Sequence, residues 1–181
     1  MSALSPFSGN IFDPLPIVGK LGQTLEGRAK RRIFAIGNYM NQRLLKPFHD
    51  WLMTVLRQIP MDGTFNQTKP LDFLVGKMTT LSYDLKSATD RWPLLIMYEM
   101  VCYLFDRGFA SATVKAALAH NIFQVPFIKS KQGVFVSFMA GQPLGYYSSW
   151  PLFALSHHLL VWWCAEPPRT TIQRLCYFRG R

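Results

Sequence analysis

Two aspartates six positions apart are the first residues in this chain whose chemistry suggests a site. Asp84 belongs to residues 79–85, whose β-branched, aromatic and aliphatic content is typical of a strand, and Asp90 follows one short loop later. Carboxylates at strand ends suit Mg²⁺, which prefers hard oxygen ligands and leaves positions open for phosphates. Asp90 has an alternative role as the cap of the helix that follows it. Asp84 is the stronger metal candidate, because a carboxylate within an apolar strand needs a partner.

A one-sided basic segment precedes these aspartates. Between residues 20 and 46, Glu26 is the only acidic residue. The same segment contains seven basic residues: Lys20, Arg28, Lys30, Arg31, Arg32, Arg43 and Lys46. Arginine and lysine in such a cluster suit phosphate groups. Considered alone, the cluster is better explained as a solvated positive loop.

A third segment combines small and hydroxyl side chains. Gly141, Gln142 and Gly145 shape a loop, and Ser148 and Ser149 open the helix that follows it. The free N–H groups and hydroxyls of a helix N-terminus suit a phosphate or a ribose. An ordinary loop with a helix cap is the alternative.

The composition favours a folded, anion-binding protein. Of the 181 residues, 49% are hydrophobic, which excludes a disordered chain, and the net charge is +10. The positive electrostatic potential of such a chain attracts nucleic acid or anionic lipid. A reading frame that is no longer under selection can also encode a basic chain. The three cysteines, Cys102, Cys164 and Cys176, show no spacing typical of a zinc site or a disulfide framework.

The elements that must position these residues are mostly helical. Asn38 is a plausible N-cap for an amphipathic helix over residues 39–59, interrupted or kinked near Pro47. Further helices are expected over residues 71–75, 92–105, 111–120 and 148–164, with a hairpin over residues 123–138. The first residues show neither a secretory signal nor a transit peptide.

Taken in order, the three segments resemble the RNA-dependent RNA polymerases of mitoviruses, capsidless RNA viruses that replicate in mitochondria. The matching segments are residues 26–46, 62–67, 83–93 and 141–166. The most specific signals are Asp84-Leu-Lys-Ser-Ala-Thr-Asp90-Arg91 and the run from Gly141 through Ser148-Ser149-Trp150 to His157-His158. The resemblance covers residues 20–166.

The resemblance implies an α+β, helix-rich fold with part of the fingers and palm of a right-hand polymerase and no thumb. Residues 1–22 would be a loose arm, residues 23–166 the polymerase-like region and residues 167–181 a divergent basic tail, which we expect to be frameshifted. Asp84 would be the catalytic aspartate that binds Mg²⁺. Arg28, Lys30, Arg31, Arg32 and Asp90 would bind the incoming nucleotide and its ribose, and Gly141, Gln142, Gly145, Ser148 and Ser149 would form a flexible loop that positions the template.

The family reaction transfers a nucleotidyl group with two metal ions, which needs carboxylates from two places in the chain. The second place in the family is a Gly-Asp-Asp turn, and these 181 residues contain none. We therefore expect an incomplete, inactive relic of a polymerase, encoded in a mitochondrial or host genome and located in the mitochondrion. RNA and nucleoside triphosphates are its expected partners, with no stable protein partner.

Three other interpretations stay open. The chain is a non-catalytic RNA- or nucleotide-binding module, or one portion of a polymerase assembled from separate chains or a recoded message. It is alternatively membrane-associated, because residues 134–165 contain no charged side chain and residues 146–165 have the length of a membrane span. Polar residues and two prolines interrupt that stretch, so a membrane role is disfavoured.

Overall fold

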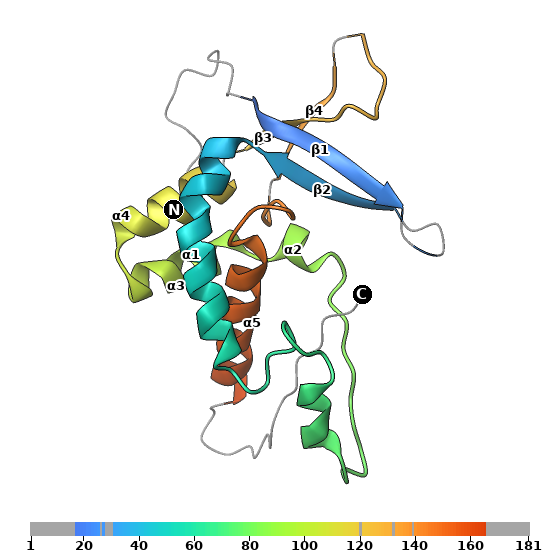
Figure 1. Ribbon diagram of the computed structural model, residues 1–181, viewed down its shortest axis with the longest axis vertical. Helices are drawn as coiled ribbons and strands as arrows, with labels where there is room; N and C mark the ends of the chain where they lie inside the picture. The colour runs from blue at the N-terminus through green and yellow to red at the C-terminus, as the bar shows by residue number, and fades with distance from the viewer. Residues whose placement is uncertain are drawn as a thin grey trace.

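The computed structural model describes residues 17–25, 27, 31–119, 121–131, 133–138 and 140–165. The fold is mixed α+β: a small sheet lies at one end of a group of helices (Figure 1). The α+β class expected from the sequence is thus confirmed at this level.

The sheet has four strands in the order β2-β1-β3-β4. Strands β1 (Ile17–Leu25) and β2 (Arg31–Gly37) form an antiparallel hairpin, and β3 (Ile122–Gln124) runs parallel to β1. Strand β4 (Phe135–Ser137) pairs antiparallel with β3, which confirms the expected hairpin. Phe123 of β3 is completely buried and links the sheet to the helical core.

Helix α1 (Tyr39–Arg57) forms because its apolar residues recur three and four positions apart. Leu45, Phe48, Leu52 and Leu56 make its buried face. Asn38 caps the first turn as expected, with the Asn41 N–H donating to Asn38 Oδ1 at 2.7 Å. Pro47 lies inside the helix without interrupting it.

The remaining helices pack around α5 (Ser149–Ala165), which contacts both α1 and α3 (Leu94–Leu104). The short helix α4 (Arg107–Ala110) leads directly into a π-helical segment, η3 (Ser111–Ala119). The core is formed by apolar side chains from each of these helices, including Leu152, Phe153, Met97, Val101, Val114 and Leu118. Within the part of the chain that the structure describes, no helix is both long and apolar enough to cross a membrane.

The expected strand over residues 79–85 is wrong. After the 3₁₀-helix η2 (Lys69–Leu74), the chain runs along the outside of the molecule to the short helix α2 (Ala88–Arg91), and residues 79–85 pair with no strand (Figure 1). Tyr83, for example, is 82% exposed. Strand-forming residues alone do not make a strand, because the backbone needs a neighbour to complete its hydrogen bonds.

Candidate functional site

The two aspartates of the sequence motif lie in different environments. Asp84 is exposed in the unpaired segment and has no ion-pair partner among the described residues. The described residues contain no group of three His, Cys, Asp or Glu side chains that could hold a metal ion. The role of Asp84 as a magnesium ligand stays a prediction. Asp90 lies in α2, where partial burial raises the pKa of its carboxyl.

The Gly/Ser segment, residues 141–149, is bonded directly to α2. The Gly141 N–H donates to the Asp90 carbonyl oxygen at 3.2 Å, and the Gln142 N–H donates to the Thr89 carbonyl oxygen at 3.0 Å. A Cβ at position 141 would lie 2.2 Å from the Thr89 carbonyl oxygen and equally close to the Asp90 carbonyl carbon. Glycine is required at 141, because no other residue fits this contact.

The same segment is also bonded to the free edge of β2. The Ala35 N–H donates to the Leu144 carbonyl oxygen at 2.7 Å. Gly145 has φ +111°, and a Cβ there would lie 2.5 Å from the Ala35 carbonyl oxygen. The left-handed backbone and the close approach both select glycine. Residues 141–149 thus join α2, which carries Asp90, to the strand that begins with Arg31 and Arg32.

Three polar side chains of this segment point into the fold. Gln142 is completely buried, and its Nε2 donates to the Ser149 carbonyl oxygen at 2.6 Å. The Ser148 Oγ donates to the Leu45 carbonyl oxygen at 3.1 Å, and its N–H donates to His49 Nδ1 at 3.1 Å. Ser149 is 1% exposed. Gln142 and Ser148 therefore hold the segment against α5 and α1, and the contact of all three residues with a template stays a prediction.

The basic cluster is described in part. Arg31 and Arg32 begin β2 and lie opposite Leu25 and Thr24, at the end of the hairpin remote from α1 (Figure 1). Arg28 and Lys30 lie outside the described residues. The role of these four cations in nucleotide binding stays a prediction.

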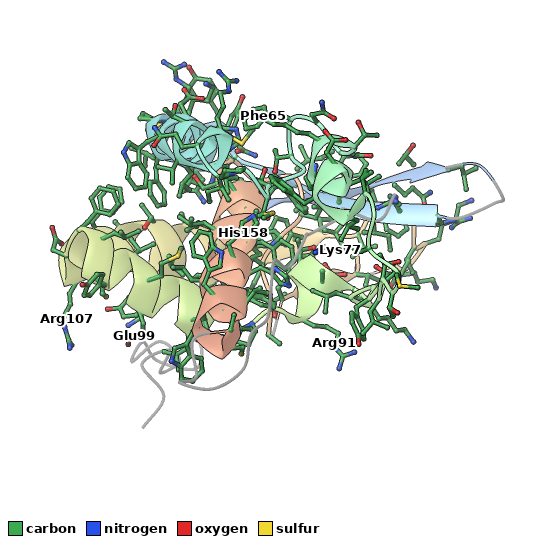
Figure 2. All side chains as sticks on the ribbon, turned by 90° about the horizontal axis from the view of Figure 1, so that it is seen from below. Phe65, Lys77, Arg91, Glu99, Arg107 and His158 are labelled. Carbon is green, nitrogen blue, oxygen red and sulfur yellow. The ribbon has the colours of Figure 1, made fainter. Side chains whose placement is uncertain are left out.

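A buried polar contact was missed by the sequence reasoning. His158 lies on α5 (Figure 2). Its Nε2 lies 2.9 Å from Asp62 Oδ2, and the side chains of His158 and Asp62 are 4% and 1% exposed. Burial works to raise the pKa of Asp62, but hydrogen bonds from His158 and Thr64 outweigh it and hold that pKa below its usual value. The contact joins residues 62–67 to α5, two segments that the resemblance had identified separately.

Two further hydrogen bonds from indole N–H groups involve α5, and the first also joins it to residues 62–67. The Trp150 Nε1–H donates to Thr64 Oγ1 at 3.3 Å, and the Trp92 Nε1–H donates to Ser156 Oγ at 2.8 Å. His157, which the sequence singled out beside His158, lies against the rings of Trp92 and Phe153. In the sequence, His158 stands out within an apolar helix and Asp62 within a turn-rich loop. Their separation of 96 residues gives no indication that they meet.

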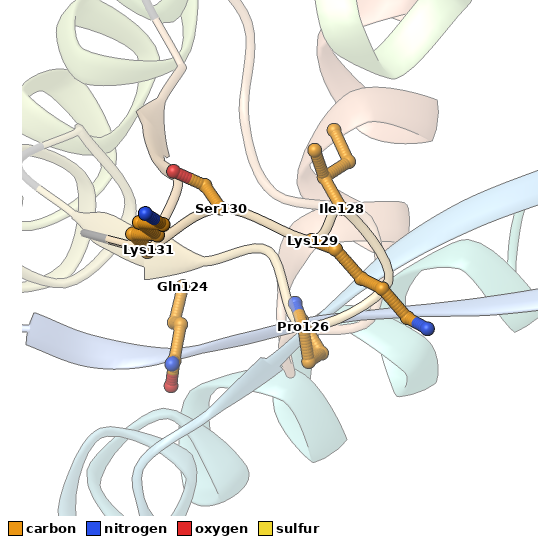
Figure 3. Close-up of a pocket in the computed structure, with 7 residues that line it drawn as sticks. Gln124, Pro126, Ile128, Lys129, Ser130 and Lys131 are labelled. Carbon is orange, nitrogen blue, oxygen red and sulfur yellow. The ribbon is translucent and has the colours of Figure 1, made fainter.

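A separate hollow lies at the β3–β4 hairpin. It has a volume of about 580 Å³ and is open to solvent, and Figure 3 shows Lys129 and Lys131 at its edge. Gln124, Pro126, Ile128, Ser130 and Gly133 complete its lining. It contains none of the site residues expected from the sequence.

Comparison with known proteins gives one family. The family model described as mitovirus RNA-dependent RNA polymerase matches residues 3–175. The RNA-directed RNA polymerase of Cryphonectria parasitica mitovirus 1 is 32% identical over 152 residues, which are 81% of this chain and 18% of the viral protein. No solved structure matches the chain.

Two relatives come from Arabidopsis thaliana, and both are named as uncharacterized mitochondrial proteins. One is 64% identical over 111 residues, covering 61% of this chain and 54% of the relative. The other is 48% identical over 115 residues, covering 62% of this chain and 45% of the relative. The chain thus spans about half the length of these two proteins.

Proposed function

Because the chain belongs to the mitovirus RNA-dependent RNA polymerase family, we propose that it is a polymerase-derived protein that binds RNA and nucleoside triphosphates. The ancestral reaction is template-directed, magnesium-dependent transfer of a nucleotidyl group to a 3′-hydroxyl. These 181 residues do not carry out that reaction by themselves.

The match over residues 3–175 is the observation that carries the proposal. The arrangement of the motifs supports it. Residues 141–149 connect the helix of Asp90 to the strand of Arg31 and Arg32, so one braced unit holds groups suited to a ribose and to phosphates. The net charge of +10 adds a general attraction for a polyanion.

The proposal that the chain alone is inactive is based on the acidic residues available to bind metal ions. Transfer by two metal ions requires acidic ligands from two places in a chain. Among the described residues, Asp84 lies in no cluster of potential metal ligands, and the sequence contains no Gly-Asp-Asp turn. We propose a relic of a viral polymerase, encoded in a mitochondrial or host genome.

The location proposed for the protein is the mitochondrion. The two Arabidopsis relatives are named as mitochondrial proteins, and the viral relative is named as a mitovirus polymerase. Fractionation of cells that express the chain, followed by immunoblotting of purified mitochondria, tests this. Detection only outside the organelle would contradict it.

Two assays on the purified chain test the function. Fluorescence anisotropy with single-stranded RNA is expected to show binding that weakens steeply as salt rises, with primer extension in Mg²⁺ giving no product. The double variant Arg31→Gln/Arg32→Gln should reduce the slope of log K against log salt by about 1. The matched variant Lys77→Gln/Arg107→Gln, with two exposed cations removed elsewhere, should reduce it less.

No binding at low salt would overturn the RNA-binding proposal. Templated extension by the chain alone would overturn the proposed loss of catalysis.

A further inference from the structure

One solvent-exposed face of α1 carries a row of three cations, one aromatic ring and one acid. The members are spaced three, four and seven residues apart, which places them on one side of a helix. They are Tyr39, Arg43, Lys46, Asp50 and Arg57. The buried side of the same helix, formed by Leu45, Phe48, Leu52 and Leu56, faces the core. Packing therefore does not explain the row.

Each of the three cations of this row is held beside an aromatic ring. The Arg43 guanidinium lies 6.0 Å from the centroid of the Tyr39 ring, and Lys46 Nζ lies 5.6 Å from that of Tyr147. The Arg57 guanidinium lies 4.5 Å from the Phe65 ring. The exposed fractions are 73% for Tyr39, 45% for Phe65 and 38% for Tyr147. Both the charges and the rings are thus accessible and partly preorganised.

The row is continuous with the candidate site. Tyr147 belongs to residues 141–149, and its N–H donates to Gln42 Oε1 of α1 at 2.9 Å. Gln42 Nε2 donates in turn to the Gly145 carbonyl oxygen at 3.3 Å. Phe65 lies in the loop that Asp62 anchors to His158 (Figure 2). The rings that flank α1 are therefore held by the contacts that brace the site.

We propose that this face, the α1 stripe, binds single-stranded RNA: Arg43, Lys46 and Arg57 contact phosphates, and the rings of Tyr39, Tyr147 and Phe65 stack on bases. The proposal rests on the proposed RNA-binding function and identifies the surface for it. Cations interleaved with aromatic rings match what a single strand offers, since every base has a face that stacks. From Tyr39 to Arg57 the stripe is about 27 Å long, at about 1.5 Å per residue.

Asp50 is the one acid of the α1 stripe. Its carboxylate lies 2.6 Å from Lys46 Nζ, in an exposed pair. Such pairs contribute little to stability, and the carboxylate repels phosphates. Removing the charge of Asp50 should therefore strengthen RNA binding if the stripe contacts the RNA. A surface that is only solvated would not show this effect.

The β3–β4 hollow is the competing basic surface. Lys129 and Lys131 offer charge there, but no aromatic ring lines the hollow (Figure 3). It can attract phosphates without stacking bases. A variant of this surface is therefore a suitable control.

The test compares two triple variants of the full chain. The stripe variant is Arg43→Gln/Lys46→Gln/Arg57→Gln, and the control is Arg107→Gln/Lys129→Gln/Lys131→Gln. Each loses three positive charges, so long-range attraction falls equally in both. Binding of a fluorescent oligouridylate is measured across a series of salt concentrations, and circular dichroism checks that each variant is folded.

We expect the stripe variant to bind about tenfold or more weakly than the native chain and its salt slope to fall by about 2, as three lost phosphate contacts on a single strand predict. The control should lose much less, and Asp50→Asn should bind several-fold more tightly. Equal losses in both variants would overturn the proposal, as would a larger loss in the control. A native chain that binds no RNA would instead overturn the proposed function. Equally tight, stripe-dependent binding to anionic lipid vesicles would show that the stripe does not select RNA.

Discussion

The contact between Asp62 and His158 is a buried polar interaction within the core. Both side chains are almost fully excluded from water, and Thr64 supplies a further hydrogen bond to the carboxylate from its N–H at 2.8 Å. A carboxylate in such a place is tolerated because its partners replace the lost hydration. The pair fixes the loop that presents Phe65 to Arg57.

Replacing Asp62 by alanine should destabilise the protein by about 1–3 kcal/mol, because the buried hydrogen bonds that the carboxylate makes with His158 and Thr64 are lost. Urea denaturation followed by tryptophan fluorescence measures this. Asp50→Asn is the matched control, because the exposed Lys46–Asp50 pair should contribute less than about 1 kcal/mol. Equal effects from the two substitutions would show that the buried pair does not stabilise the fold.

The same pair predicts a dependence on pH. The folded-state pKa of Asp62 is lowered from its ordinary value of 3.8, so its stabilising contribution is present above that value. It is lost as the pH falls through the lower, folded-state pKa. The difference in stability between the native chain and Asp62→Ala should therefore shrink in acid below about pH 4. A difference that grows in that range would contradict the assignment.

At the residue level the sequence suggested candidate side chains but not where they point. Gln142, Ser148 and Ser149 stand out as polar residues in an apolar stretch, yet they lie inside the fold. Hydrogen bonds such as that from Ser148 to Leu45, more than a hundred residues away in sequence, depend on packing. No local pattern encodes them.

Among the elements, residues 141–149 form the segment that connects α2, β2 and α1. It touches α2 through Gly141 and Gln142, β2 through Leu144, and α1 through Ser148. The contacts to α2 and β2 use main-chain atoms of the partner, whereas His49 and Gln42 of α1 contribute side-chain atoms. The segment therefore fixes the spacing of α2 and β2 without depending on the identity of their side chains. The two glycines allow this close approach.

Gly141→Ala should force α2 away from residues 141–149, because the added Cβ would overlap the backbone of Thr89 and Asp90. We expect a loss of about 1–3 kcal/mol, typical of overpacking at a rigid contact. Faster hydrogen exchange of the Gly141 and Gln142 amides would locate the change. The control is Gly27→Ala, where the added Cβ meets no atom within 4 Å. Unchanged exchange of these amides in Gly141→Ala would show that the backbone around residue 141 accommodates the added Cβ without losing stability.

Helix α1 and the hairpin over residues 123–138 were predicted, the strand over residues 79–85 was wrong, and strands β1 and β2 were not expected. The apolar period of α1 and the cap at Asn38 are local, and both are confirmed. Residues 79–85 have the composition of a strand, but a strand is completed only by a neighbour that sequence patterns do not reveal. The parallel contact between β1 and β3, across about a hundred residues, was likewise invisible.

For the whole molecule, the excess of positive charge is the dominant property. A net charge of +10 on 181 residues makes the folded chain repel itself and attract polyanions. A ligand that binds the native state and not the unfolded state stabilises the native state in proportion to its affinity. The α+β class and the family membership were both expected from the sequence, but the stabilisation of the native state by a bound polyanion depends on the charges that folding brings together on the surface.

Single-stranded RNA should therefore raise the melting temperature at low salt. At a free concentration of about 100 Kd the stabilisation is about 2.7 kcal/mol, which corresponds to about 5–10 °C for a domain of this size. Differential scanning fluorimetry at low and high salt measures the shift, which should largely disappear at high salt because binding depends on counterion release. At low salt, the stripe variant Arg43→Gln/Lys46→Gln/Arg57→Gln should show a smaller shift than the control with Arg107, Lys129 and Lys131 replaced. A fall in melting temperature with RNA would mean that the unfolded chain binds better than the folded one, and the α1 stripe would then be a charged surface without a preformed binding geometry.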